Sequence, residues 1–204
     1  MPSVSKRIVA HARSLPEATP ICAGALLHLG NRTAVDQALS RLARSGRLMR
    51  ICHGIYMRPV ETRFGPCAPD LDKALDALAD LWSVPIVPCG GAAAHVLGFT
   101  TQVPIRSVYL TSGAGRRLRF GSLDVDLRHA PRWQLAAPRR RAGEIIRALA
   151  WLGPTEVRAG LHAVLPGLSP EDIRDLAEAR ATMPHWMAEP VSHLVATPHQ
   201  ERAS

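Results

Sequence analysis

The pattern of apolar and polar positions predicts two helices near the start of the chain. Over Val4–Arg13, apolar residues alternate with basic ones at helical spacing, and the hydroxyl of Ser3 or Ser5 is suited to cap the first turn. A proline-bounded break follows. A short apolar helix is then expected over Ile21–Leu29, with Gly30 as a left-handed C-terminal cap.

The third predicted helix, Asn31–Ser45, has two distinct faces. Asn31 is a favourable N-cap residue, and Gly46 ends the helix. One face forms a buried apolar stripe, made of Ala34, Val35, Ala38, Leu39 and Leu42. The opposite face is polar and basic: Arg32, Thr33, Asp36, Gln37, Ser40, Arg41 and Arg44. The sequence therefore predicts an amphipathic helix that exposes a basic face.

A short β-hairpin is predicted directly after this helix. Its strands are Arg47–Ile51 and Ile55–Arg58, with a turn around Gly54. Three helices followed by a hairpin is the element order of a winged helix-turn-helix, in which the third helix enters the major groove and the hairpin contacts phosphates. We therefore expect an N-terminal DNA-binding domain over residues 1–60.

The exposed residues of this domain have side chains suited to DNA recognition. Arginine pairs with guanine and glutamine with adenine in the major groove, so Arg32, Gln37 and Arg41 are the expected base contacts. Thr33, Ser40 and Arg44 support them, and Asp36 lies on the same face. Arg47, Arg50 and His53 are expected to meet phosphates. Any surface helix has a polar face; the combination of cap, basic face, glycine stop and hairpin favours DNA binding over that simpler reading.

The rest of the chain predicts an α+β fold. Residues 61–69 have no periodic pattern and are expected to form a linker. A mixed domain over residues 70–190 follows, and residues 191–204 are expected to be a disordered polar tail. The predicted helices of the mixed domain are 70–82, 92–97, 139–152, 155–165 and 170–181. Its predicted strands are 105–111, 118–120 and 123–129, and they are expected to form a small antiparallel meander.

Charge is distributed unevenly along the chain. The net charge is +8, and residues 1–64 hold ten Lys and Arg against three Asp and Glu, whereas the other 140 residues hold 15 against 14. A basic segment joined to a near-neutral one is typical of a nucleic-acid-binding protein with a second role. A second arginine-rich patch could contact nucleic acid, an acidic partner or nothing. It contains Arg116, Arg117, Arg119, Arg139, Arg140 and Arg141.

Several other classes of protein are disfavoured. No apolar run approaches the ~20 residues of a membrane-spanning helix, and residues 1–13 lack the apolar stretch of a signal peptide. We therefore expect a cytoplasmic protein with no membrane partner. The four cysteines lie 30, 15 and 22 residues apart, which fits neither metal-ligand pairs nor a disulfide framework. Reduced thiols, no metal and no cofactor are expected.

Two features could indicate an enzyme, and both have simpler explanations. Asp124 and Asp126 share a strand face, but Arg119 and Arg128 flank them, so a salt-bridged exposed strand is expected instead of a metal site. His95 lies in an alanine-rich segment and is expected to be a packed core histidine. The sequence therefore does not predict an enzyme.

Several segments carry a resemblance to a bacterial family. They are residues 31–42 (NRTAVDQALSRL), 46–51 (GRLMRI) with 54–56 (GIY), and 90–104 (GGAAAHVLGFTTQVP), followed by the strand Val108–Thr111. In order and spacing they resemble the AbiEi-like antitoxins of type IV toxin-antitoxin operons, over residues 3–165. Such proteins pair a winged-helix domain that represses its own operon with a C-terminal domain needed to neutralise a nucleotidyltransferase-like toxin.

The resemblance implies a DNA-binding autorepressor and antitoxin that acts in phage defence. Its partners would be its own operator and a toxin, contacted directly or indirectly, and its oligomeric state on DNA stays open. Two alternatives from other classes also remain. One is a protein-interaction or RNA-binding module without operator binding, and the other is a nucleic-acid-processing enzyme.

Overall fold

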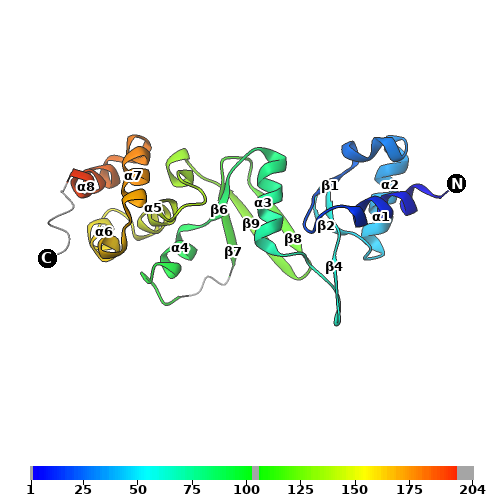
Figure 1. Ribbon diagram of the computed structural model, residues 1–204, viewed down its shortest axis with the longest axis horizontal. Helices are drawn as coiled ribbons and strands as arrows, with labels where there is room; N and C mark the ends of the chain where they lie inside the picture. Colours follow the sequence, from blue (N-terminus) through cyan, green and yellow to red (C-terminus); the bar gives the residue numbers. More distant parts are fainter. Residues whose placement is uncertain (1, 103–105, 197–204) are drawn as a thin grey trace. The chain divides into compact units, whose positions relative to one another are not determined.

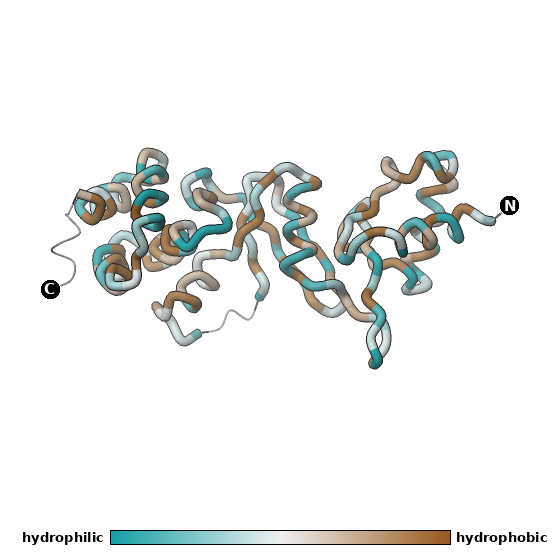
Figure 2. The backbone as a smooth tube through the Cα atoms, in the orientation of Figure 1, coloured by the Kyte–Doolittle hydropathy of each residue, from teal (hydrophilic) through white to brown (hydrophobic). Residues whose placement is uncertain are grey.

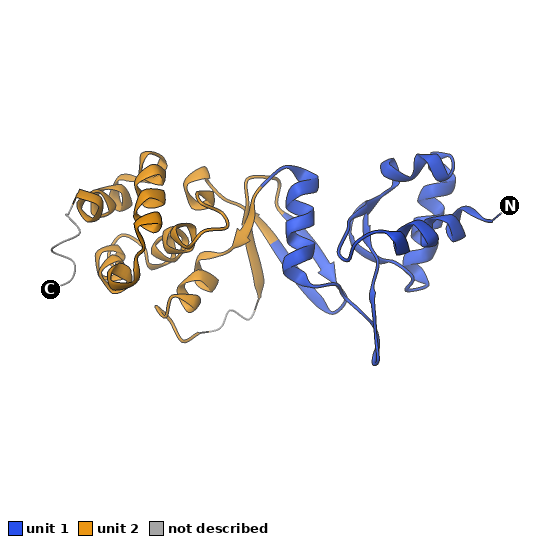
Figure 3. Ribbon diagram, viewed as in Figure 1, with its two compact units in different colours: residues 1–84, 116–126 blue, residues 85–115, 127–204 orange. Residues whose placement is uncertain are grey.

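The computed structural model describes residues 2–102 and 106–196 and shows an α+β fold (Figure 1). The chain divides into two compact units. Unit 1 comprises Met1–Val84 and Arg116–Asp126, and unit 2 comprises Pro85–Gly115 and Leu127–Ser204 (Figure 3). This division differs from the predicted boundary near residue 60, because residues 61–84 and 116–126 also belong to unit 1.

Unit 1 begins with three helical segments and a three-stranded sheet. The elements are α1 (Val4–Ser14), β1 (Ile21–Cys22), the 3-10 helix η1 (Ala23–Leu29), α2 (Arg32–Arg44), β2 (Met49–Cys52) and β3 (Ile55–Met57). The strand order is β1-β3-β2, and both pairs are antiparallel. Fully or nearly fully buried side chains from each part, including Ile8, Leu26, Leu39 and Leu48, form one hydrophobic core.

The local predictions for these elements have mixed outcomes. The caps of α1 and α2 are confirmed, since Ser3 accepts a hydrogen bond from the Lys6 amide and Asn31 accepts one from the Ala34 amide. The predicted helix over residues 21–29 is wrong at its start, where β1 pairs with β3. Gly30 is extended, at φ 167°, and is not a left-handed cap. Its site is tight instead, because a Cβ there would lie 3.2 Å from Cγ2 of Val4.

The predicted linker is a second hairpin. Strands β4 (Val60–Thr62) and β5 (Gly65–Cys67) pair antiparallel, and this hairpin extends away from the three-stranded sheet (Figure 1). The Thr62 hydroxyl closes the turn by donating to the Gly65 carbonyl at 2.7 Å. Helix α3 (Leu71–Trp82) follows, and its predicted cap is confirmed because Asp70 accepts from the Lys73 amide.

The predicted meander is wrong in its order. Strands β6 (Ile86–Pro88), β7 (Ser107–Thr111), β8 (Arg116–Phe120) and β9 (Leu123–His129) form a sheet of order β6-β7-β9-β8. Strand β9 therefore separates β7 from β8, whereas a meander would place β8 in the middle. The first residue of the predicted strand 105–111 lies outside the described residues. Helix α4 (Gly90–Val96) begins two residues before the predicted helix over residues 92–97.

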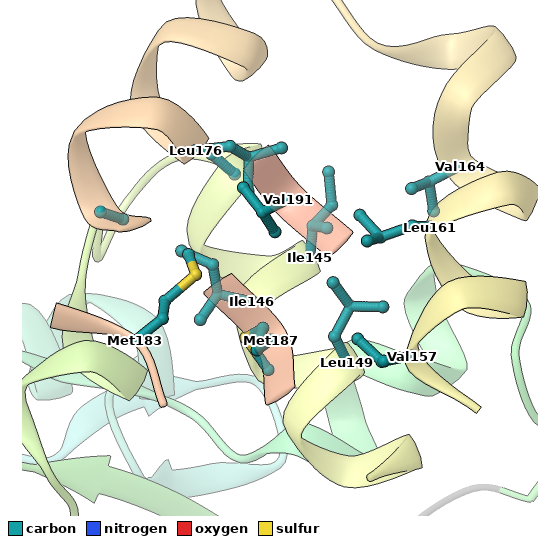
Figure 4. Close-up of a cluster of buried hydrophobic side chains, with 12 residues drawn as sticks. Ile145, Ile146, Leu149, Val157, Leu161, Val164, Leu176, Met183, Met187 and Val191 are labelled. Atoms are coloured by element: carbon teal, nitrogen blue, oxygen red, sulfur yellow. The ribbon is translucent and has the colours of Figure 1, made fainter. Parts of the chain in front are cut away.

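Unit 2 is completed by four α-helices that share one hydrophobic core. They are α5 (Arg141–Leu152), α6 (Val157–Val164), α7 (Pro170–Ala179) and α8 (His185–Ala196), with 3-10 turns η2 (Arg132–Leu135), η3 (Leu165–Gly167) and η4 (Arg180–Thr182). Figure 4 shows Ile145, Ile146 and Leu149 of α5 among side chains of the other helices, all buried. The predicted helix that begins at residue 170 is α7, and a capping box formed by Ser169 and Asp172 starts it.

The last described helix corrects the predicted disordered tail. Residues 191–196 belong to α8, and Val191 is completely buried in the core of unit 2.

Figure 2 shows that the helices carry both hydrophobic and hydrophilic residues. Within residues 2–102 and 106–196, no helix combines the length and the apolar character required to cross a bilayer.

Candidate nucleic-acid interface

Helix α2 is fixed so that one defined face meets solvent. Its N-terminus is held by Asn31, whose Oδ1 accepts a 2.9 Å hydrogen bond from the Ala34 amide. The inner face packs into the core of unit 1 through Val35, Ala38, Leu39 and Leu42, all buried. Because this face is locked, the residues predicted to contact bases lie on the outer side. Of them, only Ser40 is half-buried, and the others are exposed.

The exposed residues of α2 differ in how they are already engaged. Nε of Arg32 lies 2.8 Å from Oδ2 of Asp36, one turn along the helix. Arg44 donates to the Ser40 hydroxyl at 3.2 Å. Gln37 and Arg41 form no side-chain hydrogen bond or ion pair within the described residues. These two are therefore the side chains most available for a ligand, whereas Arg32 must leave Asp36 to contact a base.

The hairpin of β2 and β3 presents the predicted phosphate contacts. Arg47 and His53 are exposed, and the Arg50 guanidinium lies 6.0 Å from the centre of the Tyr56 ring. Gly54, at φ +74°, supplies the left-handed conformation that the turn requires. Burial raises the pKa of the nearby Cys52 thiol, while Arg116 and Arg50 act in the opposite direction. This thiol therefore stays protonated at neutral pH.

The second arginine-rich patch is divided between the two units. In unit 1, β8 contacts β2 and carries Arg116, Arg117 and Arg119. Arg116 stacks over the Trp82 ring at 4.4 Å. Arg117 pairs with Asp126 and Arg119 with Asp124, each at 3.2 Å. The prediction of a salt-bridged strand is confirmed, although Arg117 takes the place that was expected for Arg128.

In unit 2, the remaining patch arginines have structural contacts. Nη1 of Arg140 lies 2.7 Å from Oδ1 of Asp175 and 3.2 Å from Glu171. The hydrogen bond to Asp175 is the main reason that the pKa of Arg140 is raised. Arg141 lies against η3, and Arg139 also has an interaction partner. The six patch residues are therefore divided between two compact units, three in each.

Three cations that were not among the predicted DNA contacts gather near the hairpin of β2 and β3. Lys6, Arg13 and Arg58 line a cavity of unit 1 together with Arg47. The seven-residue spacing of Lys6 and Arg13 places them on one side of α1, two turns apart, and this spacing is the signal that was available in the sequence. The excess of basic over acidic residues in unit 1 lies within residues 1–64. Helix α3 and its cap add four aspartates to unit 1: Asp70, Asp72, Asp76 and Asp80.

His95 and the four cysteines are the remaining side chains that could take part in catalysis or metal binding. His95 is exposed, so the expected core position is wrong, and its Nδ1 lies 3.2 Å from the Thr100 carbonyl oxygen. The four cysteines are free thiols. Among the residues that the structure describes, no group of three His, Cys, Asp or Glu side chains could hold a metal ion.

Fold and surface define an α+β protein with an exposed basic helix beside a hairpin. The chain belongs to DUF6088, a family of unknown function whose model matches residues 7–164. Comparison with curated proteins finds no match. Among solved structures, the chain is similar to the crystal structure of the RV2827C protein from Mycobacterium tuberculosis, with 19% identity and a TM-score of 0.44 over 99% of this chain and 74% of that one.

Proposed function

We propose that the chain is a winged helix-turn-helix repressor that binds double-stranded DNA. The observation that carries this proposal is the outer face of α2, where Gln37 and Arg41 are exposed and unengaged within the described residues. The element order of residues 4–57 and the net charge of +7 over residues 1–64 support it.

The proposed binding mode assigns separate roles to helix and hairpin. Helix α2 enters the major groove, where Arg41 donates to guanine and Gln37 pairs with adenine. Arg32 exchanges its ion pair with Asp36 for a base contact, and Thr33, Ser40 and Arg44 support the helix. The hairpin residues Arg47, Arg50 and His53 contact phosphates. Base contacts then provide sequence preference, and phosphate contacts provide most of the salt-dependent affinity.

The operon role rests on the resemblance to AbiEi-like antitoxins. On that basis, the target DNA is the operator of the chain's own operon, and unit 2 serves to neutralise a nucleotidyltransferase-like toxin, directly or indirectly. A repressor and antitoxin of this kind acts in the cytoplasm. Neither role requires a metal, a cofactor or catalysis by this chain.

The test is binding to a labelled upstream fragment of the operon over a salt series, with unrelated duplex as competitor. We expect specific binding that weakens steeply with salt, with a slope of about −0.9 per phosphate contacted. The variant Gln37→Ala/Arg41→Ala should lose the preference for the upstream fragment. Arg174→Ala, which removes an exposed helical arginine of unit 2, is the control and should bind like the wild type.

The alternatives give different results in the same assay. A protein-interaction module should show little binding and a shallow salt response. An RNA-binding module should prefer single-stranded RNA of the same sequence over the duplex. Equal affinity for upstream and unrelated duplex in both the wild type and the double variant would overturn the repressor proposal.

A further inference from the structure

Unit 1 contains a cavity of about 470 Å³ that is lined by four cationic side chains. Lys6 and Arg13 come from α1, Arg47 follows α2, and Arg58 follows β3. These residues are far apart in the sequence, so the fold itself brings the charges together. Glu61 is the acidic residue in the same wall.

None of these four cations forms an ion pair with a carboxylate among residues 2–102 and 106–196. Even Glu61, which lines the same cavity, is not paired with them. In addition, Nε of Arg58 is buried and has no hydrogen-bond partner within the described chain. A buried donor without a partner is costly, and gathered like charges repel one another. An anion in the cavity offsets the repulsion among the four cations.

The cavity shares one residue with the surface proposed to bind DNA. Arg47 belongs both to the cavity wall and to the predicted phosphate contacts of the hairpin. Arg58 directly follows β3, the second strand of that hairpin. The same compact unit therefore carries the face of α2 that is proposed to contact bases and a cavity with four positive charges against one negative charge.

We propose that this cavity binds a phosphate group of the DNA backbone. The inference rests on the proposed function and adds a phosphate site formed by α1, which the winged-helix prediction did not include. Guanidinium groups match phosphate oxygens in geometry and charge, and lysine adds a further donor. The bound phosphate accepts from the lysine and guanidinium groups that line the cavity and neutralises the charge of the cluster. The site adds affinity without adding sequence preference, because phosphates are the same at every base pair.

The test compares the wild type with Lys6→Gln/Arg13→Gln/Arg58→Gln. Affinity for the upstream fragment and for unrelated duplex is measured by fluorescence anisotropy over a salt series. We expect both affinities to fall by a similar factor of about tenfold. The ratio between them should stay constant, and the salt slope should become shallower by about 1 for each phosphate lost. Circular dichroism and thermal melting establish that the variant is folded.

A charge-matched control removes three exposed arginines of unit 2, in Arg128→Gln/Arg132→Gln/Arg174→Gln. It should keep the wild-type affinity and slope. An equal loss in the control would overturn the cavity site, because net charge alone would then explain the effect. Loss of binding to the upstream fragment alone would also overturn it, since a phosphate contact cannot distinguish sequences.

A second readout follows Arg58 in the folded wild-type protein. Its Nε–H signal, assigned by its disappearance in Arg58→Gln, should shift by NMR when duplex DNA is added. No shift under saturating DNA would overturn the inference while leaving the DNA-binding proposal intact. If the wild type binds no DNA at all, the proposed function fails first, so the two failures are distinguishable.

Discussion

Each unit contains a cavity with arginine in its wall, and the two differ in what surrounds the guanidinium groups. In unit 1, Arg47 and Arg58 share a cavity of about 470 Å³ with two further cations and without ion pairs in the described residues. In unit 2, the cavity of about 740 Å³ holds Arg140, which is paired with Asp175 across 35 positions of sequence. Arg140 is thus committed to the fold of unit 2, whereas Arg47 and Arg58 of unit 1 have no carboxylate partner among the described residues.

The largest expected effects come from matched deletions in the two cores. Leu39 of α2 and Leu149 of α5 are 1% and 0% exposed. Replacing either with alanine removes the same atoms and should cost about 2–5 kcal/mol of the free energy of unfolding. Leu39→Ala should also abolish DNA binding, because it loosens the helix that carries Arg41. Denaturant melts and anisotropy check this pair. Equal loss of DNA binding in both variants would contradict the separation of roles.

Single arginine substitutions should separate the two units more finely. Arg41→Ala should weaken specific DNA binding by about 10–100-fold, the effect of losing one base contact, without changing the melting temperature. Arg140→Ala should lower the melting temperature and leave DNA binding unchanged, because it leaves Asp175 buried without its partner. A lowered melting temperature for Arg41→Ala, or weakened DNA binding for Arg140→Ala, would argue against this division.

A smaller effect is expected from the ion pair on α2. Asp36→Asn releases Arg32 and removes a negative charge from the surface that is proposed to face DNA. Affinity for any duplex should rise by a few-fold. Helix stability should fall only slightly, because exposed pairs one turn apart contribute about 0.3–0.5 kcal/mol. Anisotropy at low and high salt measures the gain, which should shrink as salt screens the charge.

The smallest effect concerns pH. The hydrogen bond from the Asp70 amide, assisted by Lys73, lowers the pKa of Glu17 below its ordinary value of 4.5. A group whose pKa is lower in the folded state stabilises that state above the unfolded pKa, and this contribution is lost as pH falls through the folded value. Glu17→Gln should therefore flatten the pH dependence of stability below about pH 4.5. Melting temperatures are measured over an acid pH series. The same pH dependence in Glu17→Gln as in the wild type would contradict the stabilising role of ionised Glu17.

Local patterns predicted the elements whose signals lie within one turn of chain. The cap at Asn31, the apolar stripe of α2 and the Gly54 turn each depend on residues three or four positions apart. Strand β1 escaped prediction because two residues, Ile21 and Cys22, give too short a pattern, and their pairing partners lie in β3. The position of β9 between β7 and β8 is likewise set by contacts that no local pattern contains.

The candidate site was predictable to a similar extent. The exposed face of α2 follows from the helical period, so its residues could be named from the sequence. The partners of the charged residues could not. Arg140 lies beside Arg139 and Arg141 in sequence, but Asp175 decides its role. The cavity cations come from three separate elements, and only the spacing of Lys6 and Arg13 gave a local signal.

The return of residues 116–126 to unit 1 has a consequence for the biosynthesis of the chain. Strand β2 is the edge of its own sheet, and β8, which contacts it, is made much later by the ribosome. Until then the edge is uncovered, and exposed sheet edges promote aggregation. Contacts between residues so far apart in sequence also slow folding. A fragment that stops at Val84 is therefore expected to aggregate more readily than a chain that continues past Asp126.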